Sequence, residues 1–114
     1  MKEINFNRAD FEPVRKIALQ FADATDSLSH YDTPSIKIKK HLLCRLHENG
    51  EWLAVRTDFE SREKFLENYP ESCFITPHYK DYPYICMYIN SYSMQLLKEV
   101  LETGFKAITG KKKK

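Results

Sequence analysis

Basic residues recur at alternate positions in the middle of this chain, which is the spacing of side chains on one face of a β-strand. Lys37 and Lys39 alternate with two isoleucines, and Arg45, Trp52 and Arg56 share a face in the register derived below. Lysine and arginine could contact phosphates there, and tryptophan could stack on a base. The residues of this predicted nucleic-acid-binding face are Lys37, Lys39, Lys40, Arg45, Arg56 and Trp52.

The charge distribution favours a plainer alternative, in which the same residues form an ordinary solvated sheet face. The formal net charge is +2, but four of the 18 basic residues are Lys111–Lys114 at the C-terminal end. The other 14 face 16 acidic residues, which leaves the body of the chain with a net charge of −2. DNA-binding domains are usually basic throughout. Attraction to double-stranded DNA would therefore need a local patch or the lysine tail.

A second candidate site is the turn-rich stretch that contains His78, Tyr79 and Tyr82, between Pro77 and Pro83. Binding residues concentrate on loops, and a histidine beside Tyr79 and Tyr82 could contact a phosphate or carboxylate. The alternative is structural: the aromatic rings close the end of the core while His78 makes a backbone hydrogen bond. A binding role predicts a concave site at this loop, whereas a flat loop would count against it.

The remaining reactive side chains do not form a recognisable metal or catalytic pattern. The cysteines are Cys44, Cys73 and Cys86, without a CxxC pair. His41 and Cys44 would point to opposite faces of a strand, and a zinc site needs about four converging ligands. Buried thiols are usually inert, and no GxSxG, HExxH, P-loop or GxGxxG is present. We therefore expect no catalytic residues, no metal and no cofactor.

Length and composition place the chain among ordinary globular domains. At 114 residues, 42% hydrophobic and 30% charged, it has the size and balance of one domain. No apolar run reaches the roughly 20 residues of a membrane span, and the N-terminal residues lack a signal-peptide pattern. An odd cysteine count without such a signal indicates reduced thiols. We expect a cytoplasmic monomer without membrane contact, with one domain over 1–110 and a basic disordered tail over 111–114.

Three segments carry apolar residues at helical spacing. They are predicted to be helices over residues 10–21, 58–69 and from 93 to near 110. Asp10 and Asp58 are the expected N-caps of the first two, and Pro70 ends the second. The apolar stripes include Phe59 in the second helix and Met94 in the third.

Alternating segments between and after these helices predict strands. They cover residues 36–39, 42–47, 51–56, 72–76 and 84–90, with a further short strand near 27–31. Asn49-Gly50 is a strong signal for a two-residue hairpin turn. That turn pairs Leu46 with Leu53 and Cys44 with Val55 on the inner face. Period-two alternation then places Arg45, Trp52, Arg56 and Leu43 on the outer face.

The turn that precedes this hairpin, around Lys40 and His41, is constrained in whether it contains an odd or an even number of residues. If Ile36 and Ile38 are to join the inner face, the loop must contain an odd number of residues, and we expect three. The inner core is predicted to comprise Val14, Ile17, Phe21, Ile36, Ile38, Leu46, Leu53, Val55, Phe65, Leu66, Ile85, Met87, Leu97 and Leu101.

The ordered segments resemble the MmcQ/YjbR-like family of small bacterial proteins. The resemblance runs from Phe11 to about Ala107 and includes Ser29–Lys37, Leu43–Gly50 and, most tellingly, Thr76–Pro83, which looks like the family's Thr-Pro-His-Tyr segment followed by Tyr-Pro. It implies a secretion-chaperone-like fold and a "double wing" DNA-binding surface. One departure is the absence of glycine from the turn around Lys40.

The expected fold is therefore α+β in two layers, with a five- or six-stranded antiparallel sheet and three helices on one face. We expect a non-enzymatic protein that binds nucleic acid, DNA in particular, through the basic face. A second hypothesis is a protein-interaction or adaptor domain, whose exposed apolar surface would contain Leu43, Trp52, Tyr84 and Tyr88. A third is a small-ligand-binding domain with a pocket around His78, Tyr79 and Tyr82.

Overall fold

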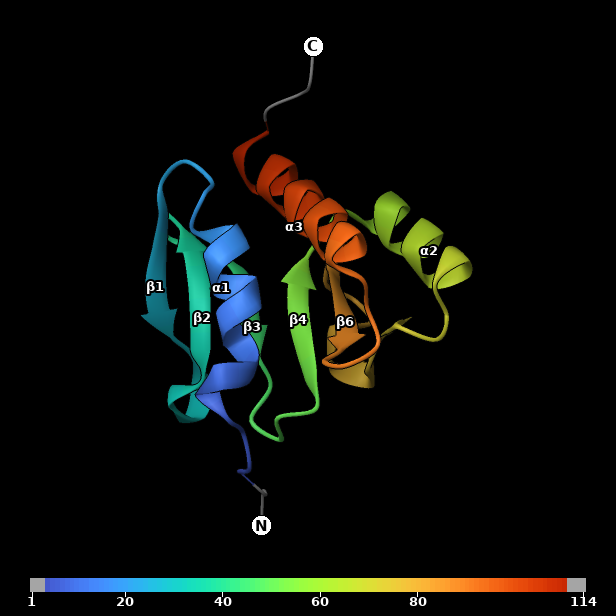
Figure 1. Ribbon diagram of the computed structural model, residues 1–114. Helices are drawn as coiled ribbons and strands as arrows, with labels where there is room; N and C mark the ends of the chain where they lie inside the picture. The colour runs from blue at the N-terminus through green and yellow to red at the C-terminus, as the bar shows by residue number, and fades with distance from the viewer. Residues whose placement is uncertain (1–3, 111–114) are drawn as a thin grey trace.

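The alternating segments form one antiparallel sheet in the computed structural model, which describes residues 4–110 (Figure 1). The spatial strand order is β1-β2-β3-β4-β6-β5, and every neighbouring pair is antiparallel. The strands are β1 (Ala24–Leu28), β2 (Pro34–Ile38), β3 (His41–Leu46), β4 (Trp52–Arg56), β5 (Cys73–Phe74) and β6 (Tyr84–Tyr88). The sheet therefore has six strands, one of the two numbers expected.

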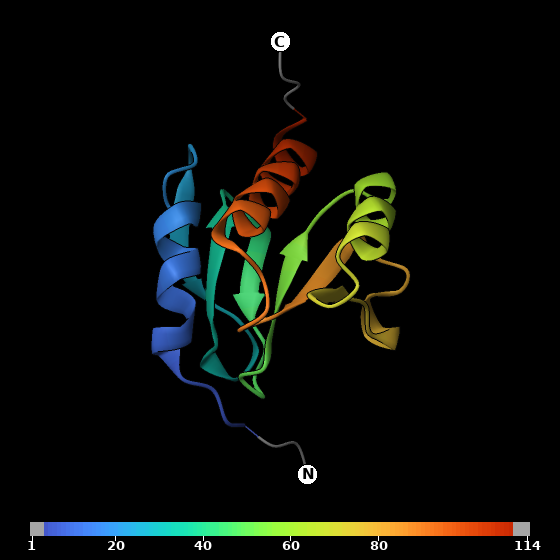
Figure 2. The same cartoon turned by 45° about the vertical axis from the view of Figure 1, so that its right-hand side comes forward.

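Helices cover this sheet and complete the predicted α+β fold. They are α1 (Glu12–Ala18), α2 (Phe59–Asn68) and α3 (Met94–Thr109), with 3₁₀ turns η1 (Arg8–Phe11), η2 (His30–Asp32) and η3 (Pro77–Tyr79). Figures 1 and 2 show α1 and α3 lying side by side over one face of the sheet, here called the inner face. Helix α2 lies at the other end of the sheet and contacts β5 and β6.

The N-terminal ends of two of the three helices, α2 and α3, lie where the sequence predicts them. Asp58 and Ser93 are N-caps whose side chains accept hydrogen bonds from Ser61 N–H and Leu96 N–H. The first helix is shorter than predicted, and Asp10 is not its N-cap. Instead Asn7 accepts a hydrogen bond from Ala9 N–H and starts the 3₁₀ turn η1, which passes directly into α1.

Two apolar residues expected in the buried helical stripes are exposed, Phe59 and Met94. Each is the first residue of its helix. Burial there depends on the turn that precedes the helix, and helical periodicity contains no information about that turn. The Phe59 ring instead lies against the guanidinium of Arg62, with its centroid 4.9 Å from Cζ.

The predicted hairpin register of β3 and β4 is confirmed. Cys44 pairs with Val55, Arg45 with Ala54, and Leu46 with Leu53. Gly50 has a φ of +77°, and a Cβ atom there would lie 2.5 Å from the carbonyl oxygen of Asn5. Glycine is therefore required both by the turn and by the N-terminal segment that packs on it.

The β2–β3 turn meets the parity requirement in an unexpected way. It contains two residues, Lys39 and Lys40, not three, because Ile38 pairs with His41. Lys39 has a φ of +57°, the left-handed conformation that the missing glycine would ordinarily supply. Parity is restored by a β-bulge, since Lys37 pairs with Leu42 and Ile36 pairs with Cys44.

This bulge corrects the position of Leu43. The residue is the extra one in β3, and adjacent residues of a bulge are not held to strict alternation. Leu43 is fully buried and belongs to the inner core, close to Gly104 of α3. It therefore does not lie on the outer face, and it is not part of an exposed apolar surface.

The inner core contains the predicted residues. Ten of the fourteen are fully buried, and Ile17, Phe21, Phe65 and Leu66 pack against them while half-buried. Helix α3 approaches the sheet closely at Gly104, where a Cβ atom would lie within 2.4 Å of the Arg56 carbonyl oxygen. The predicted basic tail, residues 111–114, lies outside the described residues.

The outer face of the sheet is covered over β4 and β6. A second, smaller apolar cluster lies there, called the outer cluster: Trp52, Ala54, Tyr79 and Cys86, with Phe74 and Tyr84 packed against them. The segment from Thr76 to Tyr84 forms its cover. The expectation of an open outer face is thus wrong in this region, because the loop between β5 and β6 folds back over it.

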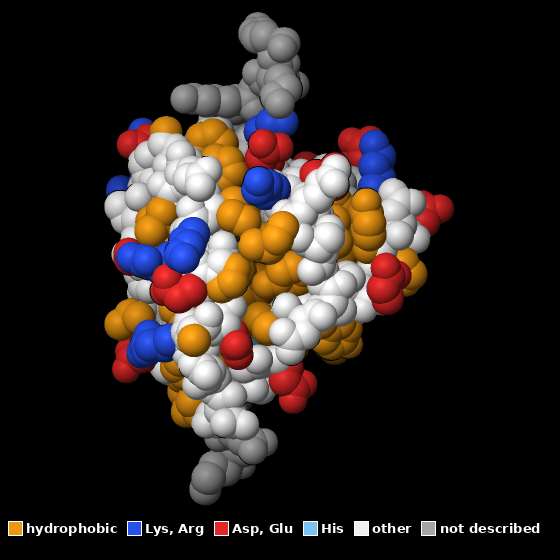
Figure 3. All heavy atoms as spheres, in the orientation of Figure 1, with side chains coloured by type: hydrophobic (Ala, Val, Ile, Leu, Met, Phe, Trp, Pro, Cys, Tyr) orange, Lys and Arg blue, Asp and Glu red, His pale blue; other side chains and the backbone are white. Residues whose placement is uncertain are grey.

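Surface charge on the inner, helix-covered side is mixed. Figure 3 shows lysine and arginine interspersed with aspartate and glutamate there, while apolar side chains form a band beside α3. Within residues 4–110, none of the helices combines the length and apolar character needed to cross a bilayer.

Candidate functional site: a pocket on the outer face

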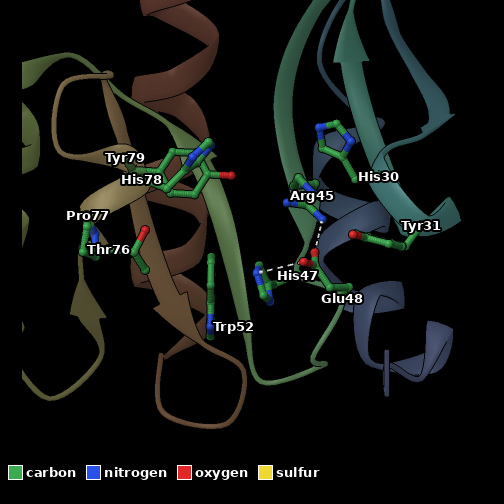
Figure 4. Close-up of a pocket in the computed structure, with 10 residues that line it drawn as sticks. All are labelled: His30, Tyr31, Arg45, His47, Glu48, Trp52, Thr76, Pro77, His78 and Tyr79. Carbon is green, nitrogen blue, oxygen red and sulfur yellow. Dashed lines mark hydrogen bonds and ion pairs between the residues drawn. The ribbon is translucent and has the colours of Figure 1, made fainter. Parts of the chain in front are cut away.

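A pocket of about 470 Å³ opens on the outer face beside the outer cluster. Three stretches distant in sequence line it: His30–Tyr31 in η2, Arg45 to Glu48 at the end of β3, and Thr76–Tyr79 leading into η3, together with Trp52. Figure 4 shows the η2 and η3 walls on opposite sides of Arg45 and Glu48. The pocket exists because the β5–β6 loop covers β4 and β6 and stops short of η2.

The floor of the pocket is a buried ion pair. Arg45 Nη2 lies 2.8 Å from Glu48 Oε1, and the two side chains are only 6% and 5% exposed. The same Nη2 donates a longer hydrogen bond to Thr33 Oγ1, at 3.3 Å. Burying two charges costs free energy that their attraction does not always recover. A buried ion pair at the floor of an open pocket is thus a feature that stability alone does not explain.

His47 is oriented by its neighbours. Its ring stacks on Trp52 with centroids 3.9 Å apart, and its Nδ1 accepts a hydrogen bond from Asn49 N–H at 3.2 Å. A ring nitrogen that accepts a hydrogen bond carries no proton, so the neutral imidazole holds its proton on Nε2. That nitrogen lies 3.5 Å from Glu48 Oε2, which gives the carboxylate a second polar neighbour.

The η3 wall is anchored by Arg62 of α2. Its Nη1 donates to the carbonyl oxygens of Tyr79, Tyr82 and Tyr84, at 2.7–3.3 Å, and its Nη2 donates to Lys80 O at 3.1 Å. One buried guanidinium thus satisfies four backbone acceptors of the loop. The arrangement couples the position of the pocket wall to helix α2.

Tyr79 packs inside this wall and presents its hydroxyl toward Arg45. Burial raises the pKa of the Tyr79 phenol, and the nearby Arg45 guanidinium partly opposes that rise. The hydroxyl therefore remains protonated at neutral pH and can donate a hydrogen bond. His78 lies edge-on to the Tyr79 ring at 4.7 Å and is exposed at the pocket mouth.

The opposite wall has an unusual backbone. Tyr31 and Asp32 both have positive φ, +61° and +60°, which is uncommon for residues other than glycine. Arg8 donates to Asp32 O, and Thr33 Oγ1 donates to His30 O, so contacts from both sides maintain the turn. The result is that the Tyr31 ring, 49% exposed, borders the pocket.

Two polar atoms of the lining residues lack a hydrogen-bond partner: Thr76 Oγ1 and Arg45 Nε. Buried polar atoms are nearly always paired, and each exception needs a physical reason. Both belong to side chains on this pocket, but each atom is itself buried, so a bound molecule would reach neither of them in this arrangement.

The predicted basic face is not one surface. Arg45 is buried and paired, and Trp52 is buried in the outer cluster. Lys37 and Arg56 are half-buried, and Arg56 Nε donates to Thr57 O. Lys39 and Lys40 are exposed at the β2–β3 turn, where Lys39 Nζ lies 4.0 Å from Asp23 Oδ2. Sequence alternation assigned Arg45 and Trp52 to the correct face, but it could not show that a distant loop covers that face.

The predicted loop site is brought together in part. His78 and Tyr79 line the pocket, whereas Tyr82 is exposed and does not line it, although its ring lies 6.3 Å from that of His78. Sequence reasoning missed His30, Tyr31 and Glu48, which come from a different part of the chain. The positive-φ turn at Tyr31 lacks the glycine that would have signalled it.

The apolar surface predicted for a protein partner is mostly self-buried. Leu43 is in the inner core, Trp52 is in the outer cluster, and Tyr84 is half-buried against that cluster. Tyr88 alone of the four is exposed, and it stacks on Phe74 at 4.3 Å.

The cysteines are buried, as expected, and burial raises the pKa of each thiol, to about 11 for Cys73 and about 12 for Cys86. Burial raises the pKa of Cys44 further. All three therefore remain thiols near neutral pH and are weak nucleophiles. Among the described residues, no group of three or more histidine, cysteine or carboxylate side chains is placed to hold a metal ion.

Comparison with known proteins identifies the fold. No family model and no curated protein matches the sequence. The crystal structure of protein DR2400 from Deinococcus radiodurans, which carries a DUF419 domain, is similar, with a TM-score of 0.71 and 17% sequence identity. The likeness covers 88% of this chain and 80% of that chain. This chain therefore has the fold of that DUF419 protein.

Proposed function

We propose that this protein is a non-enzymatic binding domain that holds a small ligand in the outer-face pocket. The observation that carries this proposal is a hollow of about 470 Å³ with a buried ion pair at its floor. Ligand pockets commonly measure about 300–1,000 Å³ and combine apolar walls with a few placed polar groups. The pocket has both properties.

The pocket accounts for more of the unusual features than a nucleic-acid-binding sheet face does. Arg45 is buried at the floor of the pocket, where the backbone of a duplex does not reach it, and Trp52 has little exposed ring to stack on a base. By contrast, the buried ion pair and the strained turn at Tyr31 both border the pocket. Strained backbone of this kind concentrates at functional sites.

The test is a fragment screen followed by ¹H–¹⁵N NMR spectra of the full chain, with acids, bases and neutral compounds in the library. We expect the shifts caused by binding fragments to cluster on the amides of residues 30–31, 45–48 and 76–79. The matched variants are His78→Ala, which should weaken binding, and His41→Ala, an exposed histidine outside the pocket, which should not. A library in which no fragment perturbs these amides would contradict the proposal.

DNA binding is a second candidate function, and the exposed turn lysines favour it. Lys39 and Lys40 are exposed in the β2–β3 turn, and the half-buried Lys37 precedes them in β2. The test is fluorescence anisotropy of a labelled duplex at two salt concentrations. Salt-sensitive binding should persist when the chain ends at Gly110, and it should be lost in Lys39→Glu/Lys40→Glu but not in Lys64→Glu/Lys98→Glu, two exposed lysines elsewhere. Binding that depends only on the tail would oppose this candidate.

Membership of the MmcQ/YjbR-like family, in a bacterial cytoplasm, is part of this proposal. The ordered segments Ser29–Lys37, Leu43–Gly50 and Thr76–Pro83 support it, and so does the DUF419 fold. These segments also contain nine of the ten residues that line the pocket.

A further inference from the structure

We propose that the ligand of the outer-face pocket is a small organic anion, a carboxylate or phosphate ester attached to a flat ring. This inference rests on the proposed function, because it names the chemical class that the same pocket accepts. Support for this ligand class comes from three properties of the pocket: the balance of hydrogen-bond donors and acceptors, the charge of the lining residues, and the shape of the walls.

The lining side chains are mostly hydrogen-bond donors. They include the Arg45 guanidinium, the Tyr79 hydroxyl, and the imidazoles of His30 and His78. A carboxylate or phosphate offers several acceptor lone pairs in one place and could satisfy such converging donors.

The charges of the lining residues disfavour a cationic ligand more than an anionic one. Among the lining residues Glu48 is the only carboxylate, and it is already 2.8 Å from Arg45 and 3.5 Å from His47. A cationic ligand would compete with Arg45 for that carboxylate and would face the imidazoles. An anion meets donors on both walls, and it would lie beside a guanidinium whose orientation Glu48 and Thr33 already hold. Such preorganisation reduces the free-energy cost of binding.

The walls favour a ring on this anion. Tyr31 borders one side, and Pro77 and the Tyr79 ring border the other. Trp52 does not supply the stacking face, since its ring is covered by His47 at 3.9 Å and by the edge of Phe74. Tyr31 is 49% exposed, and its ring is an apolar surface that a flat ligand in the pocket would contact. A volume of about 470 Å³ accommodates a ring with one charged substituent.

The experiment is a titration of the full chain with five probes, followed by ¹H–¹⁵N NMR. Benzoate and phenyl phosphate are ring anions, benzamide is the neutral isostere, benzylamine is the cation, and inorganic phosphate is an anion without a ring. We expect the tighter ring anion to bind at least tenfold more tightly than benzamide, benzylamine and inorganic phosphate. Whichever of benzoate and phenyl phosphate binds better identifies the head group.

Matched variants separate the two parts of the inference. Tyr31→Asn removes the ring while tolerating the left-handed backbone, and it should weaken the ring anions at least threefold without affecting inorganic phosphate. His78→Ala should weaken both kinds of anion, and His41→Ala should change neither. A single tryptophan, Trp52, lies in the pocket wall, so its fluorescence provides an independent readout in each variant.

The outcomes distinguish this inference from the proposed function. If benzamide or benzylamine perturbs residues 76–79 as strongly as the ring anions do, the ligand class is wrong and the pocket remains a binding site. If inorganic phosphate binds as tightly as phenyl phosphate, the ring is not recognised and the inference fails in that part. If no probe and no fragment of the wider library perturbs the pocket amides, both proposals fail.

Discussion

The two faces of the sheet are buried by different means. The inner face is covered by α1 and α3 through apolar side chains, with Leu46, Leu53 and Leu97 fully inaccessible. The outer face is covered by a loop whose backbone is held by the Arg62 guanidinium and whose neighbour is the Arg45–Glu48 pair. Apolar packing is continuous and non-directional. Charged contacts fix a few atoms and leave the space between them open, so the pocket lies on the outer face.

The largest effect is expected on the inner face, from Leu46→Ala. Leu46 is fully buried at the centre of the sheet, in the register confirmed here. Truncating such a residue lowers the free energy of unfolding by about 2–5 kcal/mol. Urea denaturation followed by circular dichroism measures the change. An unchanged denaturation midpoint would contradict the inner position of Leu46.

The second-largest loss of stability is expected from breaking the Arg45–Glu48 ion pair of the outer face. Arg45→Met leaves the Glu48 carboxylate buried without its guanidinium partner and should cost about 3 kcal/mol. The double variant Arg45→Met/Glu48→Leu should recover most of that stability, because it removes both buried charges, yet it should not bind ring anions. Thermal unfolding and the NMR titration together separate the two effects. A double variant that still binds them would show that the pair has no part in recognition.

A smaller effect is expected from Arg62→Met, which retains the aliphatic stem and removes the donors to four carbonyls. Hydrogen bonds to charged groups contribute about 1.5–3 kcal/mol, and water can replace part of this near the surface. The loss should therefore be about 2 kcal/mol. Hydrogen exchange of the amides of residues 76–84 should accelerate more than that of α3. Uniform acceleration would instead indicate that Arg62 stabilises the whole domain.

The smallest effect concerns a pair on neither face. Arg15 Nε donates to Asp26 Oδ1 at 2.7 Å, joining α1 to the edge strand β1, and this hydrogen bond lowers the pKa of Asp26 below its ordinary value of 3.8. The stabilisation is present above that ordinary value and is lost as pH falls through the lowered pKa. Because the pair is exposed, its contribution is small. Asp26→Asn should be slightly less stable than the parent at pH 7, and the difference in unfolding free energy, measured by urea denaturation at several pH values, should shrink as the pH falls below 3.8.

The local sequence pattern was sufficient to predict the features that depend only on residues close together in the chain. The Asn49-Gly50 turn predicted the register of β3 and β4, and alternation placed Leu46 and Leu53 inside. Asp58 was predicted as an N-cap and is one, because the hydrogen bond of its side chain spans only three residues. The parity argument was also correct in its requirement, although a bulge at Leu43, and not a third loop residue, satisfied it.

The pocket could not be predicted as a whole, because its walls are separated by up to about fifty residues of chain. The sequence by itself determined the two-layer α+β fold, the predicted inner core and the outward placement of Arg45 and Trp52, since hydrophobic periodicity and turn chemistry are local properties. Tertiary structure alone decided that Arg45 would be buried against Glu48, that Trp52 would lie beneath a loop, and that Tyr31 would face His78. Those outcomes depend on where the β5–β6 loop folds back, and contacts with α2 and the outer face of the sheet determine that position.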